Sequence, residues 1–214
     1  MATDFRSGGN RWVCRCVADM EDAENSLSSA AMTPRGRLRV DVPSPLARLI
    51  LVPALPAFHA RYPDIQIDMG VSDRGVDLIG DNVDCVLRGG QITDQSLIAR
   101  HVGDLQIGVY VAPSYVERLG APAHPRELQN TDHCIVGFLS SRTSKIDPLV
   151  LCSENERIEI TGNYVLAVDD GNAYLEAGLV GLGVIALPNY MAAAHQAVGA
   201  LIPLFTQWRI SPMP

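Results

Sequence analysis

The sequence predicts an α/β protein made of two lobes and preceded by one helix. Of the 214 residues, 47% are apolar and 19% are charged, which is typical of a globular chain with a sizeable core. From Gly36 onward, short apolar runs alternate with helical segments, and the alternation occurs in both halves of that region. A strand-helix-strand order of this kind indicates parallel sheets with right-handed crossovers.

Charge and cysteine content exclude several classes of protein. The 17 basic and 24 acidic side chains give a net charge of −7, which argues against general nucleic-acid binding. No run reaches the roughly 18 apolar residues of a membrane span, and residues 1–10 lack the order of a signal peptide. We therefore expect no membrane contact and a cytoplasmic location. The five cysteines are scattered, so we expect free thiols and no metal.

Residues 13–31 predict a helix with a narrow apolar stripe. The stripe repeats at spacings of three and four, and acidic residues occupy the other face. Such a stripe fits packing against a partner helix, although an ordinary amphipathic terminal helix has the same pattern. The candidate dimerisation residues are Val13, Val17, Met20 and Leu27.

The segment after residue 36 begins with a β-branched strand at 38–42. Ser44 and Pro45 then form a helix start, because the hydroxyl can cap amides and proline fits the first helical turn. The helix at 46–61 is expected to bend where Pro53 and Pro56 lack an amide hydrogen. The expected elements that complete this half are a strand at 65–71, a helical piece at 75–80 and a strand at 85–88.

The second half of the region after Gly36 repeats the alternation of strands and helices. Strands are expected at 105–112, 134–139, 157–162, 166–169 and 183–187, and helices at 113–120, 172–179 and 188–196, with one short helix inside 121–130. Because each strand is followed by a helix or a turn, we expect this half also to form a parallel sheet.

A series of segments resembles one known family. GRLRVDVPS (36–44), PALPAFHARYPD (53–64), SDRGVDLI (72–79) and NVDCVLRGG (82–90) are similar to the effector-binding domain of LysR-type transcriptional regulators. The order continues with SLIAR (96–100), APSYV (112–116), GAP (120–122), SSRT (140–143) and AGLVGLGV (177–184). Each segment alone is a weak signal, and the ordered series is a specific one.

The resemblance implies a periplasmic-binding-protein-like fold of two α/β lobes with a cleft between them, preceded by a linker helix. Residues 1–35 would then be a disordered start and the dimerisation helix, and 36–214 the effector-binding domain. Lobe I would span about 36–108 plus 206–214, and lobe II about 109–205. The resemblance also implies a homodimer or homotetramer, and DNA binding only through a winged helix-turn-helix, which we do not find in this sequence. The chain is therefore expected to be a fragment.

The function that the resemblance implies is the sensing of a small organic molecule, a carboxylate by our expectation, in order to control transcription. Two alternatives stay open. One is a solute-binding receptor of similar fold, and the other is a non-functional or dominant-negative fragment of a regulator. An enzyme is not expected, because the sequence contains no nucleophile elbow, no zinc-protease motif and no phosphate loop. We expect no catalytic residues and no cofactor.

Candidate effector-binding residues follow strands, because ligands of open α/β sheets bind at the carboxyl ends of strands. Ser44 and Pro45 offer a hydroxyl and amides that suit a carboxylate; the alternative is a plain helix cap. Arg88, Gly89 and Gly90 end a strand, and the alternative for Arg88 is an ion pair with Asp84 or Asp94. Further candidates are Phe138, Ser140, Ser141 and Asp170, of which Phe138 also suits the core and Asp170 also suits a helix cap.

Overall fold

The computed structural model describes residues 34–73, 83–90, 98–130, 132–140 and 143–214. The helix expected at 13–31, with its candidate dimerisation residues, and the helical piece expected at 75–80 lie outside these ranges. The chain divides into two compact units, Met1–Arg37 with Ala57–Gln66 and Leu38–Pro56 with Ile67–Pro214. The contacts that define the site below all lie within the second unit.

The first half builds a three-stranded sheet in the order β2-β1-β3. Its strands are β1 (Gly36–Val42), β2 (Ile65–Val71) and β3 (Cys85–Val86). Val40 of β1 lies opposite Cys85 of β3 in a parallel pair, so the expected parallel arrangement is confirmed for these two strands.

A continuous helical run follows β1. It consists of α2 (Ser44–Leu46), a π-helical turn η1 (Ala47–Leu51) and α3 (Val52–Arg61). The helix start expected at Ser44 and Pro45 is confirmed. The run widens to π geometry directly before Pro53, one of the two prolines that cannot donate a backbone hydrogen bond.

The described residues of the second half form three smaller sheets rather than one parallel sheet. β4 (Ile107–Val111) lies between β9 (Ile185–Pro188) and β10 (Ile202–Leu204), and both pairs are antiparallel. A parallel pair joins β5 (Ile135–Phe138) to β8 (Tyr164–Val168), and an antiparallel pair joins β6 (Leu149–Cys152) to β7 (Arg157–Ile160). The parallel expectation for this half is thus wrong for β4, because its neighbours are strands that return in the opposite direction.

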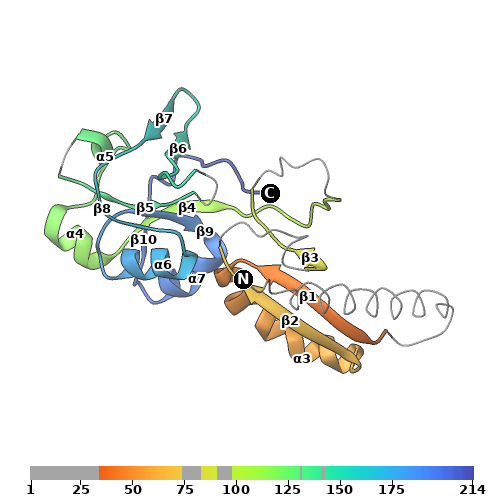
Figure 1. The fold of residues 1–214 in the computed structure, drawn as a ribbon. Coiled ribbons are helices and arrows are strands. Elements are labelled where there is room, and N and C mark those ends of the chain that lie inside the picture. The colour runs from red at the N-terminus through yellow and green to blue at the C-terminus, as the bar shows by residue number, and fades with distance from the viewer. Residues whose placement is uncertain (1–33, 74–82, 91–97, 131, 141–142) are drawn as a thin grey trace, which may run out of the picture. The chain divides into compact units, whose positions relative to one another are not determined.

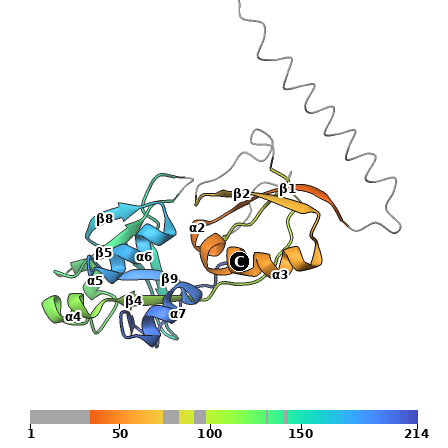
Figure 2. The same cartoon turned by 90° about the horizontal axis from the view of Figure 1, so that it is seen from below.

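Where the structure describes this half, its helices are α4 (Pro113–Leu119), α5 (Glu127–Asn130), α6 (Gly171–Leu179) and α7 (Asn189–Ala197). Helix α6 contacts β5, β8 and β9, and α7 contacts β4 and β9 (Figures 1 and 2). No helix among the described residues is long and apolar enough to cross a membrane.

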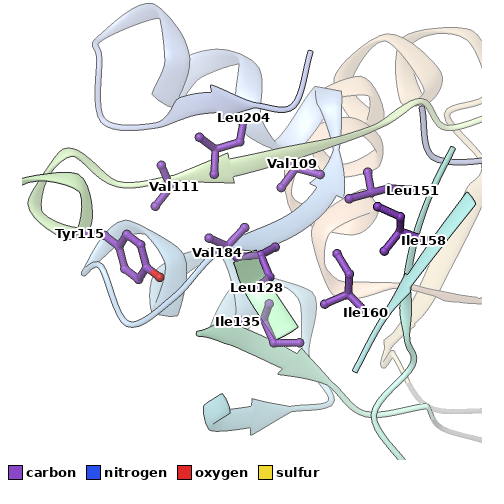
Figure 3. Packing of buried hydrophobic residues seen from close by; sticks show 10 residues of the cluster. All are labelled: Val109, Val111, Tyr115, Leu128, Ile135, Leu151, Ile158, Ile160, Val184 and Leu204. Atoms are coloured by element: carbon purple, nitrogen blue, oxygen red, sulfur yellow. The ribbon is translucent and has the colours of Figure 1, made fainter. Parts of the chain in front are cut away.

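Two apolar clusters form the core of this half. The first joins side chains from β4, β6, β7 and β10 with Tyr115 of α4 and Leu128 of α5 (Figure 3). The second packs Tyr174 and Leu175 of α6 against β9 and α7. Leu175 is fully buried, so the start of α6 is held by the core behind it.

Candidate functional site

The carboxylate of Asp73 joins the starts of two helices. The backbone amide of Ser44, the first residue of α2, donates to Asp73 Oδ1 at 2.8 Å. The backbone amide of Gly171, the first residue of α6, donates to Asp73 Oδ2 at 2.5 Å. Each carboxylate oxygen therefore accepts one backbone hydrogen bond, and bonds to an ionised acceptor are stronger than neutral ones.

The residue before Asp73 is hydrogen-bonded to the end of β1. The amide of Ser72 donates to the carbonyl of Val42 at 3.0 Å, directly after β2 ends at Val71. Since Val42 is the last residue of β1, this bond places Asp73 beside the turn that leads into Ser44.

The side chain of Ser44 does not cap its own helix, which corrects the capping role expected for its hydroxyl. Pro43 is the N-cap residue of α2, and its own side chain makes no capping hydrogen bond. Instead, Ser44 Oγ accepts a hydrogen bond from Asn172 Nδ2. The other atom of that amide, Asn172 Oδ1, is buried and has no hydrogen-bond partner within the described part of the chain.

Glycine at position 171 allows α2 and α6 to approach closely. A Cβ atom added there would lie 2.5 Å from Pro45 Cγ and 3.3 Å from Asp73 Oδ2. Pro45 is buried, so it is a packing partner of Gly171 rather than an exposed surface. The site therefore combines two backbone amides, an internal carboxylate and an unpaired amide oxygen.

The negative charge of Asp73 also acts on Tyr190 of α7. Burial, with the nearby Asp73 carboxylate adding to it, raises the pKa of Tyr190 to about 12. The phenol of Tyr190 is therefore protonated at neutral pH, so it can donate a hydrogen bond.

Arg88 is engaged in an ion pair with Asp41 of β1. Its Nη2 bonds to Asp41 Oδ1, and its Nη1 donates to the carbonyl of Leu87 at 2.9 Å. Arg88 thus has an acidic partner, as in the ion-pair alternative, and this partner is Asp41 of β1; Asp94, which that alternative also named, lies outside the described residues. Asp84 accepts from the amide of Arg39 at 2.7 Å.

Gly89 and Gly90 lie against the end of the chain. Gly90, with φ of 101°, donates its amide to the carbonyl of Pro214 at 2.8 Å. A Cβ added at Gly89 would lie 2.5 Å from Met213 Sδ. The two glycines therefore serve the close approach of the C-terminal segment, which forms a bridge from Met213 to Leu105.

The other candidate residues are dispersed. Phe138 meets Tyr174 edge to face at 5.4 Å and packs against the second apolar cluster. Asp170 caps α6, since its Oδ1 accepts from the amide of Ala173 at 2.7 Å. Ser140 closes a turn with Ser144 and Lys145 through backbone bonds, and Ser141 lies outside the described residues.

Of the sequence candidates, the structure thus brings Ser44 and Pro45 to the site, together with three residues that the sequence analysis missed. These are Asp73, Gly171 and Asn172. Asp73 follows a strand, as Ser44 does, and this position is the feature of the sequence that could have indicated Asp73 as a site residue. Nothing local in the sequence indicates that Asn172 bonds to Ser44, because 128 positions separate them.

A separate surface hollow is lined by Arg118, Leu119, Glu127, Asp132 and His133. Two of its polar side chains are held by internal contacts. Arg118 Nη2 donates to the carbonyl of Gly181 at 2.9 Å, and His133 Nδ1 lies 3.0 Å from the Tyr115 hydroxyl. Among the described residues, no group of three or more histidine, cysteine or acidic side chains could hold a metal ion.

Comparison with known proteins identifies the family. The family model of the LysR substrate-binding domain matches residues 32–214. An HTH-type transcriptional repressor of Pseudomonas aeruginosa strain UCBPP-PA14 is 32% identical over 216 residues, covering 100% of this chain and 68% of the relative. An HTH-type transcriptional regulator of Xanthomonas campestris pv. campestris is 33% identical and covers 91% of this chain but only 56% of the relative.

A solved structure agrees with this result. CrgA, a LysR-type transcriptional regulator from Neisseria meningitidis, is similar with a TM-score of 0.74 and 26% identity. The match covers 95% of this chain and 68% of that one. The protein therefore belongs to the LysR substrate-binding domain family and has its periplasmic-binding-protein-like fold. The expected family and fold are confirmed, and its relatives are transcriptional regulators rather than enzymes.

Proposed function

We propose that this chain is the effector-sensing and oligomerisation module of a LysR-type regulator in the cytoplasm, and that its effector is a small organic anion. The observation that supports the proposal is the pair of amides at Ser44 and Gly171, which together bind one carboxylate. Two N–H groups that bind an internal carboxylate have the spacing and polarity to bind an external one.

Binding at these amides has a direct mechanical consequence. A ligand held by both connects the β1–α2 corner to the start of α6, and α2 already contacts α6. Ligand control requires that the ligand prefers one of two conformations. An anion that needs both amides favours the conformation in which α2 and α6 are adjacent, and it does so more strongly than either amide alone.

The test uses two variants that differ in one hydrogen-bond donor. Ser44→Ala removes the hydroxyl and keeps the amide, whereas Ser44→Pro removes both. Proline is tolerated in the first helical turn, and Pro43 has ψ of 140°, which suits a residue that precedes proline. Thermal unfolding is followed with a panel of aliphatic and aromatic carboxylic acids.

A ligand that binds only the native state stabilises it by about 2.7 kcal/mol at 100 times its Kd. We expect at least one acid to raise the melting midpoint of the parent and of Ser44→Ala, and to leave that of Ser44→Pro unchanged. Equal shifts in all three proteins would show that the anion binds elsewhere.

Oligomerisation is assigned to the apolar stripe of residues 13–31. Val17→Glu places a charge in the stripe, and Asp19→Asn changes the opposite polar face as a matched control. Because an unpaired charge in a helix interface is costly, sedimentation should show a lower mass for Val17→Glu and the parental mass for Asp19→Asn. Parental mass in both variants would contradict this assignment.

DNA binding is assigned to a part of the longer regulators that this chain does not span, since it covers 68% and 56% of two relatives named as HTH-type. A gel-shift assay at low salt is expected to show no sequence-selective binding by this chain. Tight, selective binding would overturn that assignment.

A further inference from the structure

Asp73 occupies the position in which the proposed effector carboxylate would bind. Both of its oxygens are used, one by the amide of Ser44 at 2.8 Å and one by the amide of Gly171 at 2.5 Å. These are the same two donors that the proposed function assigns to the effector. An external carboxylate therefore cannot reach them while Asp73 stays in place.

The position of Asp73 makes it a strong competitor. The preceding residue, Ser72, donates its amide to the carbonyl of Val42, so the carboxylate is presented to the amides by its own chain. A tethered group competes as though it were present at about millimolar concentration or above. Simple acids present at lower concentrations would not displace it by charge alone.

Asn172 supplies a second, independent observation. Its Nδ2 bonds to Ser44 Oγ, so its amide group lies at the same corner, yet its Oδ1 is buried without a partner in the described part of the chain. Buried acceptors are nearly always satisfied in native proteins, and an exception needs an explanation. A ligand that carries a hydroxyl or N–H donor near its carboxylate would satisfy this oxygen.

We propose that Asp73 is a built-in competitor of the effector carboxylate, and that the effector is a hydroxycarboxylic acid that displaces it. The effector carboxylate takes the amides of Ser44 and Gly171, and its hydroxyl donates to Asn172 Oδ1. This inference rests on the proposed function and deepens it. The hydroxyl supplies the extra interaction that a plain carboxylate lacks, so Asp73 acts as a specificity filter against simple acids.

The experiment measures Kd by calorimetry for two matched pairs of probes. Propionate and lactate differ by one hydroxyl, and so do phenylacetate and mandelate. The proteins are the parent, Asp73→Asn, Asp73→Ser as a second way to remove the charge, and Asp147→Asn as a control at an exposed aspartate. Cooperative melting of each variant establishes that it is folded.

We expect lactate or mandelate to bind Asp73→Asn and Asp73→Ser about 10-fold or more tightly than the parent, because removal of the competitor raises the binding-competent fraction. Asp147→Asn should behave as the parent does. The hydroxy acid should bind about 2- to 10-fold more tightly than its matched plain acid, which is the range of one hydrogen bond.

Two results would overturn the inference, and they differ in what they say about the proposed function. If hydroxy acids bind the parent as tightly as the Asp73 variants, or bind the variants more weakly, Asp73 is not a competitor and the anion site itself stands. If no acid binds any of the proteins, the inference and the proposed anionic effector fail together, because the amides are then available and still unused.

Discussion

The substitution Gly171→Ala tests the close packing of α2 on α6. The new Cβ would lie 2.5 Å from Pro45 Cγ and 3.2 Å from Pro45 Cδ. Carbon atoms in contact are normally about 3.5–4.0 Å apart, so the two helices must separate by roughly 1 Å or distort locally. Separation would also lengthen the two bonds that Asp73 makes.

Two opposing contributions set the change in the free energy of unfolding that Gly171→Ala causes. Overpacking of a tight contact costs about 1–3 kcal/mol. Replacement of a helical glycine by alanine returns up to about 1 kcal/mol. We therefore expect Gly171→Ala to lower the free energy of unfolding by about 1–2 kcal/mol. Gly103→Ala is the matched control, because a Cβ added at Gly103 has no atom within 4 Å; its stability should change little.

A double-mutant cycle isolates the contact. Pro45→Ala removes the two Pro45 atoms that the new Cβ would meet, so the double variant should lose less stability than the sum of the two single losses, by about 1–2 kcal/mol. Urea unfolding followed by circular dichroism gives the four free energies. Losses that add to within about 0.5 kcal/mol would refute the argument that Pro45 and Gly171 are in contact.

Three further predictions concern the core and its charges. Leu175→Ala should cost about 2–5 kcal/mol because the side chain is fully buried, whereas Val198→Ala, at a position 77% exposed, should cost little; urea unfolding compares them. Burial raises the pKa of Tyr174 to about 12, so the unfolded chain loses the phenol proton first, and stability should fall between about pH 10 and 12 by up to about 3 kcal/mol. Tyr174→Phe should reduce that fall, and an unchanged alkaline profile would contradict the prediction. Asp41→Ala removes a carboxylate that Arg88 binds in a partly buried pair and should cost more than the double replacement with Arg88→Met; equal costs would contradict the coupling of the two side chains.

Local patterns in the sequence identified most elements of the fold. The alternation at 65–71 predicts β2 with its observed bounds, and the Ser44-Pro45 pair predicts the start of α2. Two strands were missed for physical reasons. β6 (Leu149–Cys152) is a continuous apolar run of four residues without alternation, and β10 (Ile202–Leu204) contains Pro203, which argues against a strand. Pro203 is accommodated because β10 pairs with β4 alone, at one end of its sheet.

The site was predicted only in part. Ser44 and Pro45 were recognised because helix capping and strand ends are local features of sequence. Their partners come from elsewhere, since Asp73 lies 29 positions from Ser44 and Asn172 lies 128 positions from it. The direction of strand pairing brings such residues together, and that direction differed from the expectation for the second half of the chain.

One measurement tests the central claim most directly, namely that an organic anion binds the amides of Ser44 and Gly171. Amide proton and nitrogen resonances of the labelled chain are recorded during titration with the acid that raises the melting midpoint most. We predict that the Ser44 and Gly171 resonances shift together and saturate at one Kd, as the Asp73 carboxylate is replaced. Saturable shifts confined to other residues, with both of these amides unmoved, would contradict the claim.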